Sequence, residues 1–169
     1  MGLLSFLFGG RPDPTLDWPL STGPAPEFDI SAATLGPLKF DAALEDARFL
    51  GRPDEAQWKS GKIVKLLWAR WGLELEFIEG RLAFLDWIIG PDPFAPTHRD
   101  LRFAHPRPVG GPDLDGRTTE ADLVAWLGPP DRRDADADET ILEWEKNEVI
   151  HEFELTPAGS LKRWNAYEV

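Results

Sequence analysis

The segment LGRPD at residues 50–54 is matched by LGPPD at residues 127–131, and the expected architecture depends on this match. Glycine followed closely by proline is typical of a helix end, because glycine accepts left-handed geometry and proline prevents the helix from continuing. Each segment follows a short stretch of helical character, DAALEDARFL before the first and TTEADLVAWL before the second. The sequence therefore predicts two short helices that end at the glycine of each segment, with Asp41 and Thr118 as their N-caps.

Runs of alternating and β-rich residues follow each expected helix, separated by turn residues. This pattern predicts an α+β fold made of two tandem repeats, each a short helix followed by a three- or four-stranded antiparallel meander. The expected strands are residues 63–71, 73–79 and 81–89 in the first repeat and residues 139–146, 149–156 and 160–169 in the second.

Four segments make up the predicted organisation of one compact body. An apolar N-terminal segment and a Pro/Gly-rich coil occupy residues 1–34, and the first repeat occupies residues 35–90. A proline-rich loop at 91–114 connects it to the second repeat at 115–169. The apolar residues 3–8 are expected to dock on the core, and the alternative is a weak contact with a membrane or a partner.

Composition excludes several classes of function. The 169 residues include 18 basic and 30 acidic side chains, a net charge of −12, which opposes binding to nucleic acid or anionic membranes. The chain has no cysteine, so it has no disulfide, thiolate metal site or cysteine nucleophile. It also has neither a signal peptide pattern nor an apolar run long enough to span a bilayer. We expect a soluble, cytoplasmic, bacterial-type protein with a basic protein as its partner.

Four glutamates of the second repeat form a comb of carboxylates. Glu143, Glu145, Glu152 and Glu154 recur at every second position on two neighbouring strands, so they are expected to share one solvent-facing patch. Like charges on adjacent strands are unfavourable unless cations lie near. The comb is therefore a candidate surface for a basic partner, and the alternative is an acidic face that serves solubility alone.

Three of the eight tryptophans are further candidates for a binding surface. Trp58, Trp71 and Trp87 do not fall at matched inward positions of the two repeats, and tryptophan is enriched where proteins bind partners. Tryptophans at the matched positions are instead expected to fill the core.

The chain offers no complete catalytic or metal-binding motif. The run Asp134–Asp138 has calcium-ligand spacing, but Glu139 stands where an EF-hand loop needs glycine, so no metal is predicted. His151 lies on the apolar side of its strand and is interpreted as a core or pocket residue, with a general base as the alternative. No cofactor is predicted.

A short capped helix that ends in Leu-Gly-x-Pro, followed by a meander and present twice, resembles the tandem-repeat architecture of the β-lactamase inhibitor protein family. Single units are similar to the small outer-membrane lipoproteins of the SmpA/OmlA family. The resemblance covers residues 38–89 and 115–169. It implies a non-catalytic scaffold that presents the face or edge of its sheet to another protein.

The sequence thus predicts a non-enzymatic protein-binding module, of the inhibitor or immunity type, for a basic partner. Two alternatives stay open. One is a domain that binds a small molecule or lipid through a Trp-rich face. The other is a small hydrolase with His151 as its base.

Overall fold

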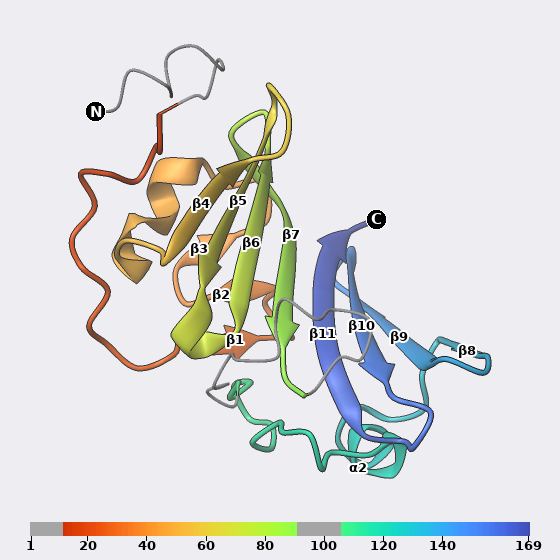
Figure 1. Cartoon of the computed structure of the whole chain (residues 1–169). Coiled ribbons are helices and arrows are strands. Elements are labelled where there is room, and N and C mark those ends of the chain that lie inside the picture. Colours follow the sequence, from red (N-terminus) through yellow and green to blue (C-terminus); the bar gives the residue numbers. More distant parts are fainter. Residues whose placement is uncertain (1–11, 91–105) are drawn as a thin grey trace.

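The computed structural model describes residues 12–90 and 106–169 and is built mainly from β-strands (Figure 1). An eight-stranded antiparallel sheet forms the body of the molecule. In order across this sheet, its strands are β4 (Glu55–Trp58), β5 (Ile63–Trp68), β6 (Leu73–Ile78), β7 (Arg81–Ile88), β11 (Leu161–Glu168), β10 (Val149–Leu155), β9 (Thr140–Lys146) and β8 (Arg132–Ala135). A second sheet contains β1 (Phe28–Asp29), β2 (Thr34–Leu35) and β3 (Leu38–Lys39). The helical elements are the 3-10 turns η1 (Leu44–Leu50) and η2 (Ala69–Trp71) and the α-helix α2 (Glu120–Leu127).

The predicted α+β fold of two tandem helix-plus-sheet repeats is wrong. Strand β7 pairs with β11, from Phe84 opposite Tyr167 to Ile88 opposite Arg163, so one continuous sheet replaces two. The first expected helix is a 3-10 helix, and β1, β2 and β3 form a further sheet where coil and the start of a repeat are expected. The sequence pattern assigns strands but not their partners, because local alternation carries no information about which distant strand an edge will meet.

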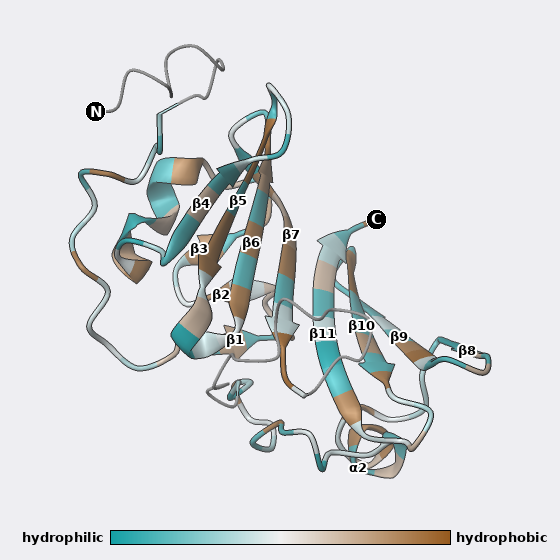
Figure 2. Cartoon of the chain, viewed as in Figure 1, coloured by the Kyte–Doolittle hydropathy of each residue, from teal (hydrophilic) through white to brown (hydrophobic). Residues whose placement is uncertain are grey.

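Alternation of apolar and polar residues explains why these segments are strands with one buried face. In β6, Leu73, Leu75 and Phe77 are buried while the residues between them are partly exposed, and Figure 2 shows the matching bands of colour along this strand. A strand with this period-two pattern buries one face and solvates the other. We call the buried side of the large sheet the inner face and the opposite side the outer face.

The inner face is covered by the small sheet and by the helical elements. Phe28 of β1 packs edge-on against the rings of Trp87 and Trp164, at centroid distances of 6.1 and 5.2 Å. At the other end of the large sheet, Trp126 of α2 meets Phe153 of β10 edge-on at 6.5 Å. These contacts between aromatic rings join both halves of the large sheet into one core.

The two matched glycines end their helical elements as predicted. Gly51 has φ 74° and ψ 177°, and Gly128 has φ 83° and ψ −175°, a conformation that is essentially restricted to glycine. The predicted N-caps are displaced, because η1 starts after Ala43 and α2 starts after Thr119. The side chain of Thr119 accepts a hydrogen bond from the backbone N–H of Asp122, so the threonine next to the predicted cap takes this role.

Both glycine segments also make the same contact with the sheet. The indole Nε1 of Trp68 donates to the carbonyl of Gly51 at 3.0 Å, and the indole of Trp144 donates to the carbonyl of Gly128 at 3.1 Å. Each carbonyl thus binds the second strand after its glycine, β5 for Gly51 and β9 for Gly128. The similarity of the two segments therefore reflects one kind of helix-to-strand connection used twice.

Two predictions concern parts of the chain outside the described residues. These are the docking or membrane contact of residues 3–8 and most of the expected connecting loop, residues 91–105. Within residues 12–90 and 106–169, no helix has the length and apolar character needed to cross a membrane.

Candidate functional site

A row of polar side chains crosses the outer face of the large sheet. Antiparallel pairing places one residue from each of six consecutive strands directly opposite the next, from β6 to β8. Such opposed side chains on one face of a sheet lie close enough to interact. We call this set the central row; its members are Glu74, Asp86, Asn165, Glu152, Glu143 and Arg132.

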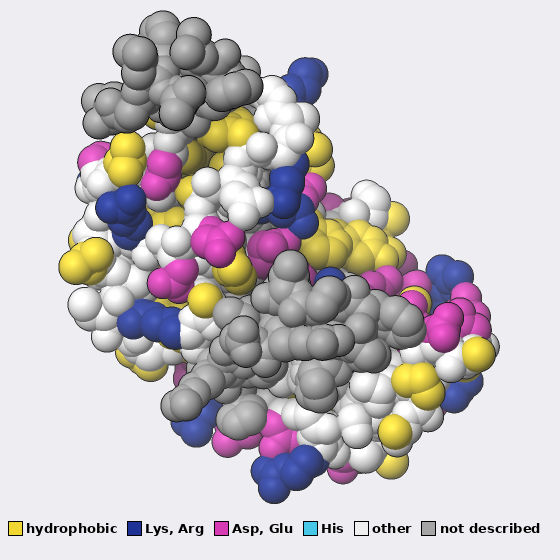
Figure 3. Space-filling model, viewed as in Figure 1, with side chains coloured by type: hydrophobic (Ala, Val, Ile, Leu, Met, Phe, Trp, Pro, Cys, Tyr) yellow, Lys and Arg dark blue, Asp and Glu magenta, His cyan; other side chains and the backbone are white. Residues whose placement is uncertain are grey.

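Cations neutralise part of the negative charge on this face. Lys65 Nζ lies 2.7 Å from Glu74 Oε1 and 3.2 Å from Glu76 Oε2, and Arg132 Nη1 lies 3.2 Å from Glu143 Oε1. Figure 3 shows basic and acidic side chains intermixed over one face of the molecule. The outer face thus combines several ion pairs with an excess of carboxylates.

Lys162 adds a cation at the margin of the outer face. Its side chain is almost fully buried, and its ammonium group bridges Glu139 and Glu154, with Glu154 Oε2 at 3.1 Å. Two carboxylates beside one ammonium leave this corner of the face negative. Burial lowers the pKa of Lys162, but the two carboxylates together raise it by more, so the net result is a raised pKa.

Asp86 lies at the middle of the central row and is 4% exposed. Its Oδ2 is 3.4 Å from Arg163 Nη1, whereas its Oδ1 accepts no hydrogen bond from any described residue. Burial raises the pKa of Asp86 to about 7, and the nearby carboxylates of Glu74 and Glu154 act in the same direction while Arg163 and Lys65 oppose them. A buried carboxylate with one unsatisfied oxygen is a costly arrangement that calls for an explanation.

Asn165 lies directly opposite Asp86 and is also 4% exposed. Its Nδ2 donates to Glu152 Oε1 and to Glu154 Oε1, each at 2.8 Å. Since both amide hydrogens point at these glutamates, the amide oxygen is directed elsewhere, and among the described residues it has no hydrogen-bond donor. Two buried oxygen acceptors from adjacent strands therefore lack a donor.

Beside the central row, the outer face carries a half-exposed apolar stretch. The rings of Phe84 and Tyr167 stack at 5.7 Å on the paired strands β7 and β11, and Ile150 of β10 lies opposite Tyr167. Glu76 and Glu145 flank this stretch in the same cross-strand row. Aromatic side chains at the centre with charges around them are the usual composition of a protein interface.

The structure brings together three of the four predicted glutamates. Glu143 and Glu152 are neighbours in the central row, and Glu154 shares the amide of Asn165 with Glu152. They are half-buried and hydrogen-bonded, so the expected solvent-facing patch is in fact a partly covered polar network. Burial and the neighbouring carboxylates Glu154 and Glu143 raise the pKa of Glu152. Glu145 is the exposed member, in the adjacent row.

The three predicted tryptophans do not share a surface. Trp87 is fully buried on the inner face and stacks on Trp164 at 5.1 Å. Trp71 is 5% exposed and stacks on Trp68, with the guanidinium of Arg70 4.3 Å above its ring. Trp58 is half-buried on the edge strand β4, where its Nε1 donates to the carbonyl of Pro12 at 3.1 Å. Two of the three are thus core residues.

His151 is fully buried on the inner face, where it packs beside the rings of Phe28 and Trp164. Burial lowers the pKa of His151 to about 4, and neither ring nitrogen has a hydrogen-bond partner among the described residues. This environment lacks the solvent access and the orienting partner that a general base needs. In the described part of the chain, no three His, Asp or Glu side chains are grouped so that they could hold a metal ion.

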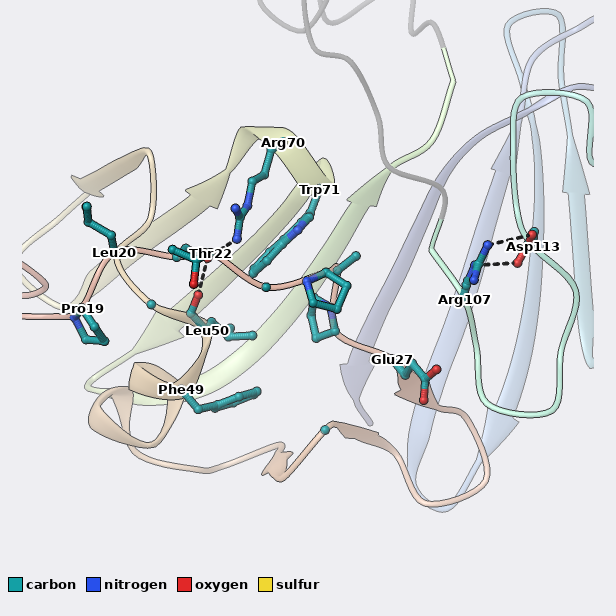
Figure 4. Close-up of a pocket in the computed structure, with 17 residues that line it drawn as sticks. Pro19, Leu20, Thr22, Glu27, Phe49, Leu50, Arg70, Trp71, Arg107 and Asp113 are labelled. Carbon is teal, nitrogen blue, oxygen red and sulfur yellow. Dashed lines mark hydrogen bonds and ion pairs between the residues drawn. The ribbon is translucent and has the colours of Figure 1, made fainter.

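A half-open groove of about 1210 Å³ lies away from the central row, between residues 19–27 and the elements η1 and η2 (Figure 4). Two pairs of its polar side chains bind one another, because Arg70 Nη2 donates to Ser21 Oγ at 2.6 Å and Arg107 pairs with Asp113 at 3.0 Å. The remaining lining is mainly apolar, and Phe49 at its wall is 47% exposed.

Sequence reasoning missed Asp86 and Asn165, the two buried acceptors of the central row. Asp86 does leave a signal, because it is the one charged residue in the apolar strand segment LAFLDWII. A carboxylate in such a segment is rarely buried without a functional or structural reason. Asn165 leaves no comparable signal, since its position opposite Asp86 depends on the pairing of β7 with β11.

Comparison with known proteins gives one structural likeness and no family. No family model and no curated protein matches the chain. A solved structure of a DUF4309 family protein, YjgB from Bacillus subtilis, is similar over 78% of this chain and 82% of its own, with 15% sequence identity and a TM-score of 0.49. The resemblance to the β-lactamase inhibitor protein family stays a prediction.

Proposed function

We propose that this chain is a non-enzymatic protein-binding module that holds a basic partner against the outer face of its large sheet. The observation that carries the proposal is the half-exposed stack of Phe84 on Tyr167 beside the carboxylates of the central row. The stack supplies apolar area for a contact, and the carboxylates select the sign of the partner's charge. An inhibitor or immunity-type role and a cytoplasmic location, both expected from the sequence, belong to this proposal.

Charge complementarity supports a basic partner over a neutral one. The carboxylates of the outer face outnumber its cations, and the whole chain carries a net charge of −12. A field of this sign accelerates association with a cationic protein and repels an anionic one. Carboxylates crowded on adjacent strands also raise the free energy of the unbound protein, and a basic partner would relieve this repulsion.

Charge reversal on the outer face tests the proposal. The double variant Glu76→Lys/Glu145→Lys changes both ends of the row that contains the aromatic stack. The parent and this variant would be immobilised and exposed to lysate of the source organism in a series of salt concentrations. We expect the parent, but not the variant, to retain a protein of high isoelectric point, with retention that weakens as salt rises.

Glu27→Lys provides a matched control. Glu27 is exposed and directly precedes β1 of the small sheet, which packs on the inner face, so this substitution reverses a charge away from the outer face. We expect this variant to retain the same partner as the parent. If all three proteins retain the same set, or if only proteins of low isoelectric point are retained, the outer face is not the interface and the proposal fails.

The groove beside Trp71 supports a second candidate function, the binding of an apolar small molecule or lipid. Its volume of about 1210 Å³ and its mainly apolar lining suit such a ligand. A titration with a fluorescent fatty acid tests this candidate. Binding that the Phe49→Ser variant weakens would support it, and binding that this variant leaves unchanged would place the ligand elsewhere.

A further inference from the structure

We propose that Asp86 and Asn165 form a seat for one primary ammonium group, the side-chain terminus of a lysine on the partner. This inference rests on the proposed function and deepens it, since it assigns the chemical group that the outer face recognises. It starts from two side chains that are each 4% exposed and each carry an oxygen that accepts no hydrogen bond within the described residues.

The two unsatisfied oxygens belong to directly opposed residues. Asp86 on β7 and Asn165 on β11 form a cross-strand pair, whose side chains project from the same face at the close spacing of such pairs. The other polar atoms of these residues are engaged, Asp86 Oδ2 with Arg163 and Asn165 Nδ2 with two glutamates. When Asp86 is ionised, the pair presents two acceptors and no donor, so a ligand that binds both oxygens must donate.

The negative charge around Asp86 and Asn165 favours a cationic donor. Glu74 and Glu152 flank the pair in the central row, and Glu154 lies one step away through the Asn165 amide. An ammonium group has three donors and no acceptor, so it can satisfy both oxygens and one flanking carboxylate together. Its apolar stem would lie along the half-exposed rings of Phe84 and Tyr167, as lysine stems do on apolar surfaces.

The two unsatisfied oxygens are closed to solvent in the unbound protein, so an ammonium group reaches them only when the partly exposed side chains around them move aside. Glu74, Glu152, Glu154 and Tyr167 are partly exposed around Asp86 and Asn165. A buried floor with low local dielectric strengthens attraction for a cation, and it penalises a neutral ligand that leaves the carboxylate unpaired. These properties favour lysine over a neutral side chain of equal length.

A small probe tests the seat without the unknown partner. Nα-acetyl-lysine methylamide would be titrated into the full chain at pH 8 while the side-chain amide signals of Asn165 are followed by NMR. The Nε-acetylated form of the same probe, which has no charge, is the matched control ligand. We expect the charged probe to shift the Asn165 amide signals and to bind about tenfold more tightly than the neutral one.

Variants assign the effect to Asp86. Asp86→Asn keeps the shape of the side chain and removes its charge, and it is expected to weaken binding of the charged probe about tenfold. Glu27→Gln, on the other side of the molecule, is expected to have no effect. Equal binding of both probes, equal binding by Asp86→Asn, or the absence of any shift at Asn165 would overturn the seat.

The parent alone gives a second readout, should Asp86→Asn fail to fold. The charged groups that face Asp86 are Lys65 of β5, Glu74 of β6, Glu152 and Glu154 of β10 and Arg163 of β11. Because burial raises the pKa of Asp86 to about 7, most of its carboxyl groups are neutral at pH 5. Binding of the charged probe should therefore weaken from pH 8 to pH 5, and unchanged binding would contradict the seat.

The seat and the proposed function fail in distinguishable ways. If Asp86→Asn retains the basic partner as strongly as the parent while Glu76→Lys/Glu145→Lys loses it, the outer face binds the partner and the lysine seat is wrong. If no outer-face variant changes retention of any protein, the proposed function is wrong, and the probe titration still decides whether the seat binds ammonium.

Discussion

We expect acid to change the free energy of unfolding in opposite directions through two buried titratable groups. His151 on the inner face has a pKa lowered to about 4 by burial, and Asp86 on the outer face has a pKa raised to about 7 by burial. Replacing each group by a side chain that does not titrate, as in His151→Leu and Asp86→Asn, should separate the two effects. Leucine is close to histidine in volume and suits the apolar surroundings of Phe28 and Trp164.

As the pH falls, His151 binds a proton in the unfolded chain at a higher pH than in the folded protein. Its pKa falls from 6.5 when unfolded to about 4 when folded, so the contribution to stability is present above pH 6.5 and is lost as the pH falls toward 4. The whole shift corresponds to about 3 kcal/mol, of which about 2 kcal/mol is lost between pH 7 and pH 5.

As the pH falls, Asp86 binds a proton in the folded protein at a higher pH than in the unfolded chain. Its pKa rises from 3.8 to about 7, so stability is greatest below the unfolded value and is lost as the pH rises through 7. The whole shift corresponds to about 4 kcal/mol, and lowering the pH from 7 to 5 recovers about 2 kcal/mol of it. Between pH 7 and pH 5 the two contributions to the unfolding free energy nearly cancel, so neither is visible in the pH dependence of the parent.

Urea unfolding followed by tryptophan fluorescence at pH 7, 6 and 5 measures these contributions, and this range stays above the isoelectric point of about 4.6. Relative to the parent, His151→Leu should gain about 2 kcal/mol of unfolding free energy from pH 7 to pH 5, and Asp86→Asn should lose about 2 kcal/mol. The double variant should follow the parent. Titrating groups far from both sites are common to the four proteins and cancel in the differences.

The result that would refute this reasoning is a set of parallel profiles. If His151→Leu follows the pH dependence of the parent, His151 titrates alike in the folded and unfolded chains, and its ring is solvated in the native protein. If Asp86→Asn follows the parent, the carboxyl of Asp86 has a cation or water partner strong enough to offset its burial. Either outcome would show that burial of the corresponding group does not contribute to the pH dependence of stability.

Three further substitutions have defined outcomes. Gly128→Ala should lower the unfolding free energy by about 1–3 kcal/mol, because alanine is strained at φ 83°. Gly51→Ala should lower it more, since the added Cβ would also lie 2.6 Å from the backbone Cα of Ser21. Equal losses in urea unfolding would show that this overlap relaxes freely. Thr119→Ala should lower the unfolding free energy by about 1 kcal/mol through loss of the α2 cap, seen as a lower melting temperature, and an unchanged melting temperature would mean that water replaces the cap. Lys162→Met should lower the unfolding free energy at pH 7 by about 2 kcal/mol, because the partly buried Glu139 and Glu154 lose their shared cation; a more stable variant would show that burying the ammonium costs more than its two contacts return.

Much of the strand content was predictable from alternation alone. The expected strands at 73–79, 81–89 and 149–156 agree with β6, β7 and β10 to within one residue at each end. These segments place large apolar residues at every second position, and a one-residue shift would expose the whole apolar set. The prediction fails where alternation stops. Residues 69–71 were expected to continue β5, but they form the 3-10 turn η2.

The outer face shows why the site itself was only half predictable. Period-two counting correctly placed Glu143, Glu152 and Glu154 on one face, because that property belongs to each strand alone. Their exposure and their cations depend on neighbours that the count does not supply: Arg132 comes from β8, and Lys162 and Asn165 come from β11. The same holds for Asp86, whose opposition to Asn165 exists only because the last strand of the chain pairs with β7. Cross-strand register sets the charge balance of a sheet face, so a comb of like charges in one hairpin indicates where cations are needed. Only the full order of the sheet identifies which cations the protein itself supplies. The rest are those that a partner would have to provide.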